Sequence, residues 1–164
     1  MTRPRASCVR FALDGQSFGL PLDQVREITA VQRVHPVPFA PPHILGLINL
    51  RGQVVTLLDV AAILGRPFSQ EAAAGMALVL SAPRENLALR VPAPVQIGEA
   101  RPVAVASMAA AGASDDGTAA AHDMVGMASQ DLGPDDLVEM LSAPDLIARV
   151  EERLLAGFRT GVAP

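Results

Sequence analysis

The residues best suited to polar chemistry in this sequence are few, and most stand apart from one another. The three histidines, His35, His43 and His122, lack the spacing of a metal-binding motif, and the first two flank prolines in a predicted loop. The single cysteine, Cys8, begins a predicted strand without an adjacent base, which favours a small buried apolar residue over a nucleophile. No nucleophile elbow, phosphate-binding glycine loop or paired-carboxylate motif accompanies them. We therefore expect no catalytic residues, no metal and no cofactor.

Arg51 differs from these residues because it places a permanent charge between two apolar segments. The run ILGLINLRGQVVTLLD at 44–59 predicts two buried strands joined at Arg51 and Gly52. A guanidinium at such a tip offers a planar set of donors suited to a carboxylate or carbonyl group of a partner. The alternative is an ordinary solvated turn residue. Asn49 and Gly52 are expected to be structural turn residues, with Asn49 satisfying a backbone group.

The elements that position Arg51 begin with a predicted N-terminal hairpin. Alternating apolar residues predict strands at 9–13 and 16–20, and Asp14 and Gly15 are the strongest hairpin signal because both positions of a type I′ turn take positive φ. A short helix is predicted next, from Asp23 to Ile28.

The predicted helix depends on the spacing of three between Leu22, Val25 and Ile28. Val25 and Ile28 are candidate interface residues, with core positions as the alternative. Glu27 between them is either part of the same surface or simply solvated.

The rest of the chain predicts further short elements. A strand is expected at 33–37 and a short helix at 61–64, while later strands are expected at 76–80, 86–91, 124–127 and 137–141. Pro92 and Pro94 interrupt the pattern, and the Ala/Gly/Ser/Asp-rich stretch 108–121 predicts a mobile loop. Ser142 to Asp145 has the form of a capping box opening a terminal helix. Its apolar side consists of Leu146, Ile147, Val150, Leu154 and Leu155.

Composition narrows the class of protein. The 164 residues are 50% hydrophobic, which is enough for a sizeable core, and the net charge is −4. Nucleic-acid binding is disfavoured because the chain is acidic and lacks Trp and Tyr for base stacking. No signal peptide and no uninterrupted apolar run of about 18 residues is visible. We therefore expect a cytoplasmic protein without direct membrane insertion, built from short strands as small β-barrels.

Three stretches carry a recognisable order of residues. They are FALDGQSFGL at 11–20, VREI at 25–28 and ILGLINLRGQVVTLLD at 44–59. Together they resemble the CheW-like domain of bacterial chemotaxis coupling proteins, most closely over residues 8–65. The Asn-Leu-Arg-Gly turn followed by an apolar strand ending in Asp is the most specific part of the match.

The resemblance implies an all-β fold of two SH3-like five-stranded β-barrel lobes sharing an apolar interface, with short helices and a C-terminal helix. A tail at 1–7 would precede a single domain at 8–160. Its first lobe would span about 8–70 and its second about 75–157, with the mobile loop at 108–121.

The implied function is a non-enzymatic adaptor that joins the cytoplasmic tip of a chemoreceptor to the regulatory domain of a CheA-type histidine kinase. It would reach membrane-associated receptor arrays only through these partners. The receptor-binding residues carried over by the resemblance are Val25, Glu27, Ile28, Gly46 and Arg51.

The second lobe departs from the family pattern. ALRVP at 88–92 stands where the family usually has Gly-Leu-x-Val-Asp, so that the final Asp is replaced by Pro92. Such divergence fits a specialised coupling protein, and it bears on the kinase partner more than on the receptor. The alternative function is a ligand-binding sensory module with a small-molecule site at the lobe junction, which would need a roomy pocket with convergent polar groups.

Overall fold

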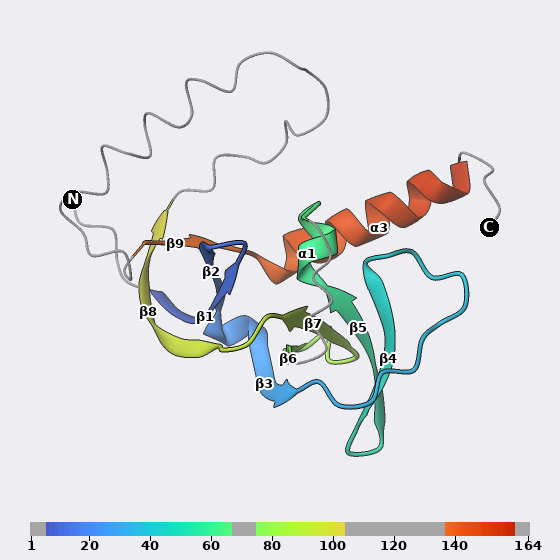
Figure 1. The fold of residues 1–164 in the computed structure, drawn as a ribbon, viewed down its shortest axis with the longest axis horizontal. Helices are drawn as coiled ribbons and strands as arrows, with labels where there is room; N and C mark the ends of the chain where they lie inside the picture. The colour runs from blue at the N-terminus through green and yellow to red at the C-terminus, as the bar shows by residue number, and fades with distance from the viewer. Residues whose placement is uncertain (1–5, 67–74, 104–136, 160–164) are drawn as a thin grey trace, which may run out of the picture.

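The computed structural model describes residues 6–66, 75–103 and 137–159, which form two β-sheets and a long C-terminal helix (Figure 1). The first sheet is a closed barrel with the strand order β1–β2–β9–β8. Its strands are β1 (Ala6–Leu13), β2 (Gln16–Pro21), β8 (Gln96–Val103) and β9 (Leu137–Met140). β1 therefore begins inside the predicted tail at 1–7.

The second sheet has five strands in the order β3–β6–β7–β5–β4. They are β3 (Val25–Ala30), β4 (Ile44–Leu50), β5 (Gln53–Asp59), β6 (Met76–Leu80) and β7 (Leu87–Val91). The all-β class with two lobes and a C-terminal helix is confirmed.

The predicted division of the lobes at about 8–70 and about 75–157 is wrong. Each sheet takes strands from both ranges, because β5 pairs with β7, and β2 pairs with β9, in parallel across long stretches of chain. Parallel neighbours cannot be joined by a tight turn, so they come from distant parts of the sequence.

Both predicted turns form as local sequence chemistry requires. Asp14 and Gly15 have φ values of 50° and 75° between β1 and β2. Arg51 and Gly52 have φ values of 50° and 88° between β4 and β5. Two successive residues at positive φ are the signature of a type I′ turn, whose twist matches that of the flanking strands.

The helix predicted from Asp23 to Ile28 is wrong. Only Leu22–Gln24 form a single 3₁₀ turn, η1, and β3 follows at once. The register of β3 against β6 shifts between Val25 and Glu27, which makes Arg26 the extra residue of a β-bulge. A bulge advances the alternation by one position, so Val25 and Ile28 share a face of the strand although their spacing of three suggested a helix.

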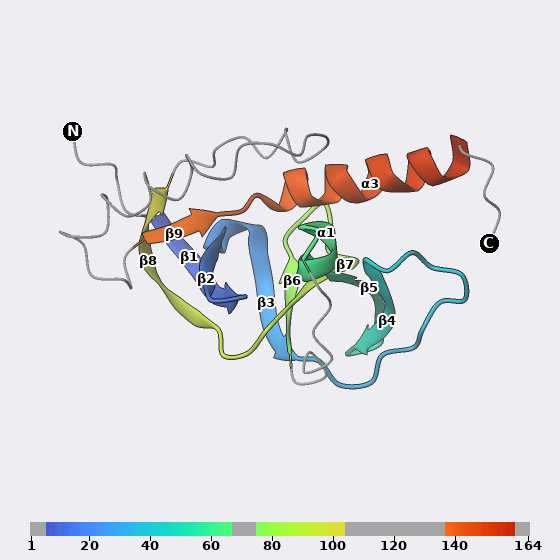
Figure 2. The same cartoon turned by 45° about the horizontal axis from the view of Figure 1, so that its top comes forward.

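One apolar core joins the two lobes. It contains side chains from β1, β2, β5, β6, β7, the helices and the segment before α3, so the predicted apolar interface is present. α3 (Ala143–Arg159) begins between the two sheets and extends over the five-stranded sheet, beside the short α1 (Val60–Ile63), as Figure 2 shows. Four of the five predicted apolar helix residues pack against this core, whereas Leu155 is 64% exposed.

Other sequence predictions fall into three groups. β4 to β7 and the short helix α1 lie close to their predicted positions. The segment 33–37 is not a strand and forms only an isolated bridge between His35 and Leu47, while β8 was not predicted after Pro92 and Pro94. The predicted loop at 108–121 and strand at 124–127 lie outside the described residues.

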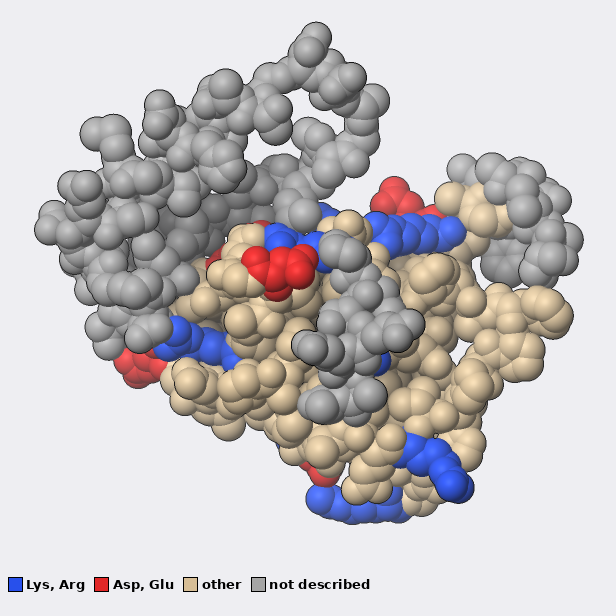
Figure 3. Space-filling view, viewed as in Figure 1, with Lys and Arg blue, Asp and Glu red and all other residues tan. Residues whose placement is uncertain are grey.

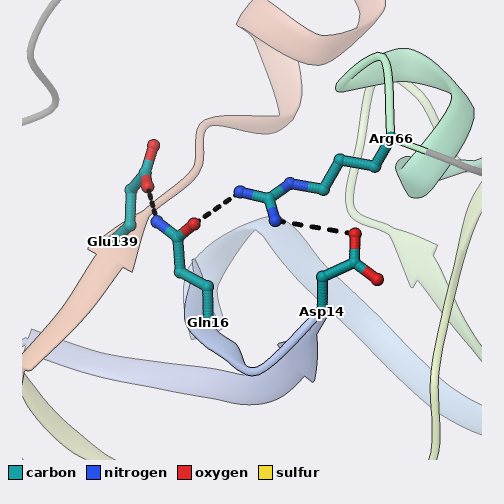
Figure 4. A network of polar contacts seen from close by, with 4 residues as sticks. All are labelled: Asp14, Gln16, Arg66 and Glu139. Atoms are coloured by element: carbon teal, nitrogen blue, oxygen red, sulfur yellow. Dashed lines mark hydrogen bonds and ion pairs between the residues drawn. The ribbon is translucent and has the colours of Figure 1, made fainter. Parts of the chain in front are cut away.

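A polar network also ties the barrel to the second sheet (Figure 4). Arg66, just after α1, donates to Gln16 and lies 3.7 Å from a carboxylate oxygen of Asp14. Gln16 in turn donates to Glu139 on β9. The Arg66 guanidinium is also 5.2 Å from the centre of the Phe18 ring, in cation–π range. The predicted turn residue Asp14 therefore has a second role in joining the lobes.

Candidate functional site

The β4–β5 hairpin presents Arg51 at its tip, away from the rest of the second sheet (Figure 1). The Asn49 side-chain oxygen accepts a hydrogen bond of 2.8 Å from the Gly52 amide, as expected for a residue that satisfies the turn. This contact and the positive φ values fix the backbone below Arg51. The Arg51 side chain is 85% exposed above this well-defined backbone.

The Arg51 side chain extends from the hairpin tip to Glu27 on β3. Its Nη2 donates to Glu27 Oε1 at 2.9 Å, joining the hairpin tip to β3 on the opposite edge of the five-stranded sheet. The Glu27 side chain is 26% exposed, so it is more buried than its partner Arg51. An ion pair this exposed contributes little to stability, about 0–1 kcal/mol.

The opening between these two edges is here called the β3–β4 slot. It comprises two adjoining depressions of about 490 and about 410 Å³ that share Glu27, Leu50 and Arg51. The other residues along the slot are Arg26, Thr29, Ala30, Gln32, Arg33, His35, Ile48, Asn49 and Gln53. Basic side chains gather at the lower end of the molecule, over the β4–β5 hairpin, with a smaller acidic area beside them (Figure 3).

Val25 and Ile28 do not face the slot. They stand opposite Leu80 and Leu78 of β6 and pack against the core shared by the two lobes. Glu27 stands opposite Val79, on the other face of β3. The alternative reading of Val25 and Ile28 as core residues therefore describes their contacts, and of the five predicted receptor-binding residues the structure brings only Glu27 and Arg51 into contact.

Gly46 has a steric role that the sequence did not reveal. Its φ is 145°, and a Cβ built on it would lie 2.3 Å from the carbonyl oxygen of His35. His35 and Leu47 exchange two backbone hydrogen bonds of 2.8 Å, which bring the segment after β3 against β4 at this point. Gly46 thus permits the close approach that closes one end of the slot.

A buried ion pair near the lobe junction was also missed. Asp59 Oδ2 accepts from Arg90 Nη2 at 2.9 Å, with the two side chains 3% and 9% exposed. Asp59 Oδ1 also accepts from the Ala61 amide and so caps α1. The signal was present as the Asp that ends the apolar strand, but the parallel register that pairs Asp59 with Arg90 cannot be read locally.

Of the cysteine and histidine residues considered for polar chemistry, the structure describes Cys8, His35 and His43. Burial raises the pKa of the Cys8 thiol, against a smaller lowering by Arg10, and Cys8 is fully buried in the barrel. Burial, followed by the charge of Arg153, lowers the pKa of His43, which is 5% exposed. Within the described ranges, no group of three or more His, Cys, Asp or Glu side chains is placed to hold a metal ion. No helix in those ranges is long and apolar enough to span a bilayer.

Fold and site together define a two-sheet β protein with a charged surface slot. The model of the CheW-like domain family matches residues 7–150, and the chain belongs to that family. This confirms the resemblance on which the expected fold was based.

Individual relatives match shorter segments. A chemotaxis protein CheW of Rhizobium meliloti (strain 1021) is 37% identical over 65 residues, covering 40% of this chain and 42% of that protein. A probable chemotaxis protein CheW of Rhizobium etli is 33% identical over 85 residues, covering 52% and 55%. The chain thus spans about half the length of the curated relatives it matches.

A solved structure shows the same fold. The crystal structure of the scaffolding protein TtCheW from Thermoanaerobacter tengcongensis superposes with a TM-score of 0.51 and 23% identity. The superposition covers 57% of this chain and 64% of that one.

Proposed function

We propose that this protein is a non-enzymatic cytoplasmic adaptor that couples chemoreceptors to a CheA-type histidine kinase. The observation that carries the proposal is the CheW-like family match over residues 7–150. The names of the relatives, chemotaxis protein CheW and scaffolding protein, support the same role. The alternative, a sensory module with a small-molecule site at the lobe junction, stays a prediction.

The receptor contact is assigned to the hairpin tip and the β3 edge, at Arg51 and Glu27. Arg51 combines high exposure with a fixed backbone, so little conformational entropy of the main chain is lost when a partner binds. Gly46 would act on the same contact indirectly, through the close approach of His35 to β4. Val25 and Ile28 would act through the packing of β3 against the core.

The first test is a sedimentation assay with receptor-containing membranes and the Arg51→Glu variant. Binding should be lost, because the substitution places a carboxylate beside Glu27 and removes the donor that faces a partner. The melting curve should be unchanged, since Glu at this positive φ carries about the same backbone cost as Arg. Arg149→Glu on α3 makes the same change of charge away from the slot and is the matched control.

Normal sedimentation of a natively folded Arg51→Glu variant would reject the assignment of Arg51. The adaptor role itself is tested by a pull-down from native cytoplasm. Recovery of a receptor together with a histidine kinase is expected, and recovery of neither would contradict the proposed function.

A further inference from the structure

The β3–β4 slot is unusual because it is basic on an acidic protein. The chain has a net charge of −4, yet the slot is lined by Arg26, Arg33 and Arg51 with a single carboxylate, Glu27. Arg26 is neutralised by Glu85 at 3.1 Å, and Arg51 is paired with Glu27. Arg33 is exposed and has no ion-pair partner among the residues that the structure describes.

The apolar residues that would make this slot a hydrophobic groove face elsewhere. Val25 and Ile28 lie on the opposite face of β3, in contact with the core. Recognition in the slot therefore combines charge and hydrogen bonds with an apolar contribution from Leu50 and Ile48.

We propose that the slot binds an acidic segment of the receptor. In the free protein, Glu27 occupies the position that a carboxylate of this segment takes in the complex. In the bound state a partner carboxylate pairs with Arg51 in place of Glu27, and another pairs with Arg33. The inference rests on the proposed function, since it names the chemistry of the partner at that site.

The geometry of the existing ion pair favours a carboxylate as the ligand. Arg51 already donates to a carboxylate oxygen at 2.9 Å, so its guanidinium is placed to bind a carboxylate at this position. Exchange is inexpensive because the Arg51–Glu27 pair is exposed and screened by solvent. Arg26 and Arg51 are already paired with Glu85 and Glu27, so the slot suits one or two carboxylates better than the long run of phosphates of a nucleic acid.

The Glu27→Gln variant tests whether a partner carboxylate replaces Glu27 on Arg51 or is only attracted by the positive charge of the slot. The substitution keeps the shape of the side chain and removes the internal competitor for Arg51. Acidic partners should then bind about 1.5- to 5-fold more tightly, the factor that corresponds to an exposed ion pair. Glu99→Gln, at an exposed carboxylate on β8, changes the net charge equally and should give no comparable gain.

The experiment titrates the full chain with two capped peptides of roughly 15 residues, long enough to form some helix in water. One contains Ala, Leu and Glu, and its twin has Gln in place of Glu. NMR of the arginine side chains should show shifts at Arg33 and Arg51 with the acidic peptide only. The affinity should fall when salt is raised from about 50 mM to about 300 mM. Glu27→Gln should tighten binding, and the additional change Arg51→Gln should cancel that gain.

Equal behaviour of the two peptides, including no binding of either, would overturn the proposal. So would weaker binding by Glu27→Gln, or inorganic phosphate shifting the same arginines at lower concentration than the acidic peptide. If receptor membranes still bind the wild-type chain in any of these cases, the proposed function stands and only the acidic-partner inference fails.

Discussion

The buried pair of Asp59 and Arg90 gives the sharpest prediction about stability. Asp59→Asn removes the negative charge but keeps a good cap for α1, because Asn accepts the Ala61 amide as Asp does. The Arg90 side chain, which is 9% exposed, then loses its ion pair with the Asp59 carboxylate. Breaking a buried pair in this way costs about 3–5 kcal/mol.

The cap can be measured separately from the pair. Asp59→Ala removes both and should cost about 1 kcal/mol more than Asp59→Asn. For a chain of this length, a loss of about 3 kcal/mol lowers the melting temperature by roughly 6–12 °C. The assay is urea unfolding followed by circular dichroism, with the free energy extrapolated to water.

A double-mutant cycle completes the test. Arg90→Met alone leaves Asp59 buried and unpaired, whereas Met and Asn together remove both charges, so the double variant should be more stable than the sum of the single losses predicts. The exposed pair of Arg26 and Glu85 is the control, with an expected coupling of about 0–1 kcal/mol. A loss below about 1 kcal/mol for Asp59→Asn would refute the reasoning from burial.

Three further predictions follow from single residues. Gly46→Ala should lower the melting temperature, with about 1–3 kcal/mol of backbone strain added to the clash with the His35 carbonyl; a native melting curve would contradict the steric role. Because the pKa of His43 is lowered on folding, the unfolded chain binds the extra proton, so stability should be full above the unfolded value of about 6.5 and fall as the pH drops through the folded value. His43→Leu should flatten this dependence in urea titrations at successive pH values. Cys8 should react with a thiol reagent only on unfolding, since burial raises its pKa and blocks access; rapid labelling of the native protein would exclude this.

The sequence was most informative where structure is decided locally. The turn at Asp14–Gly15 was predicted because positive φ at two successive positions depends on the residues themselves, and the turn at Arg51–Gly52 was predicted from the apolar strands on either side of it. The terminal helix was predicted from its cap and its apolar side, although Leu155 is exposed while the adjacent Leu154 packs against the core.

Non-local geometry explains what the sequence could not provide. The bulge at Arg26 exists only in the pairing of β3 with β6. Because of it, the spacing of three between Val25 and Ile28 places both residues on one face of a strand and not on one side of a helix. The pairing of Asp59 with Arg90 likewise depends on the parallel register of β5 and β7. For the candidate site, the sequence named Arg51 and Glu27 separately, but their contact across the slot required the fold.

The interleaved sheets also determine the order in which the molecule can form as it is synthesised. All five strands of the second sheet are made between Val25 and Val91, so that sheet can begin to pair while the chain is still growing. β1 and β2 leave the ribosome before the other described strands, yet β2 must wait for β9, whose Glu139 is 123 positions from Gln16. Such distant pairing is slow. The lobe that contains the N-terminus is therefore the last to close, and until then the edges of the β1–β2 hairpin are open to a chaperone or to another chain.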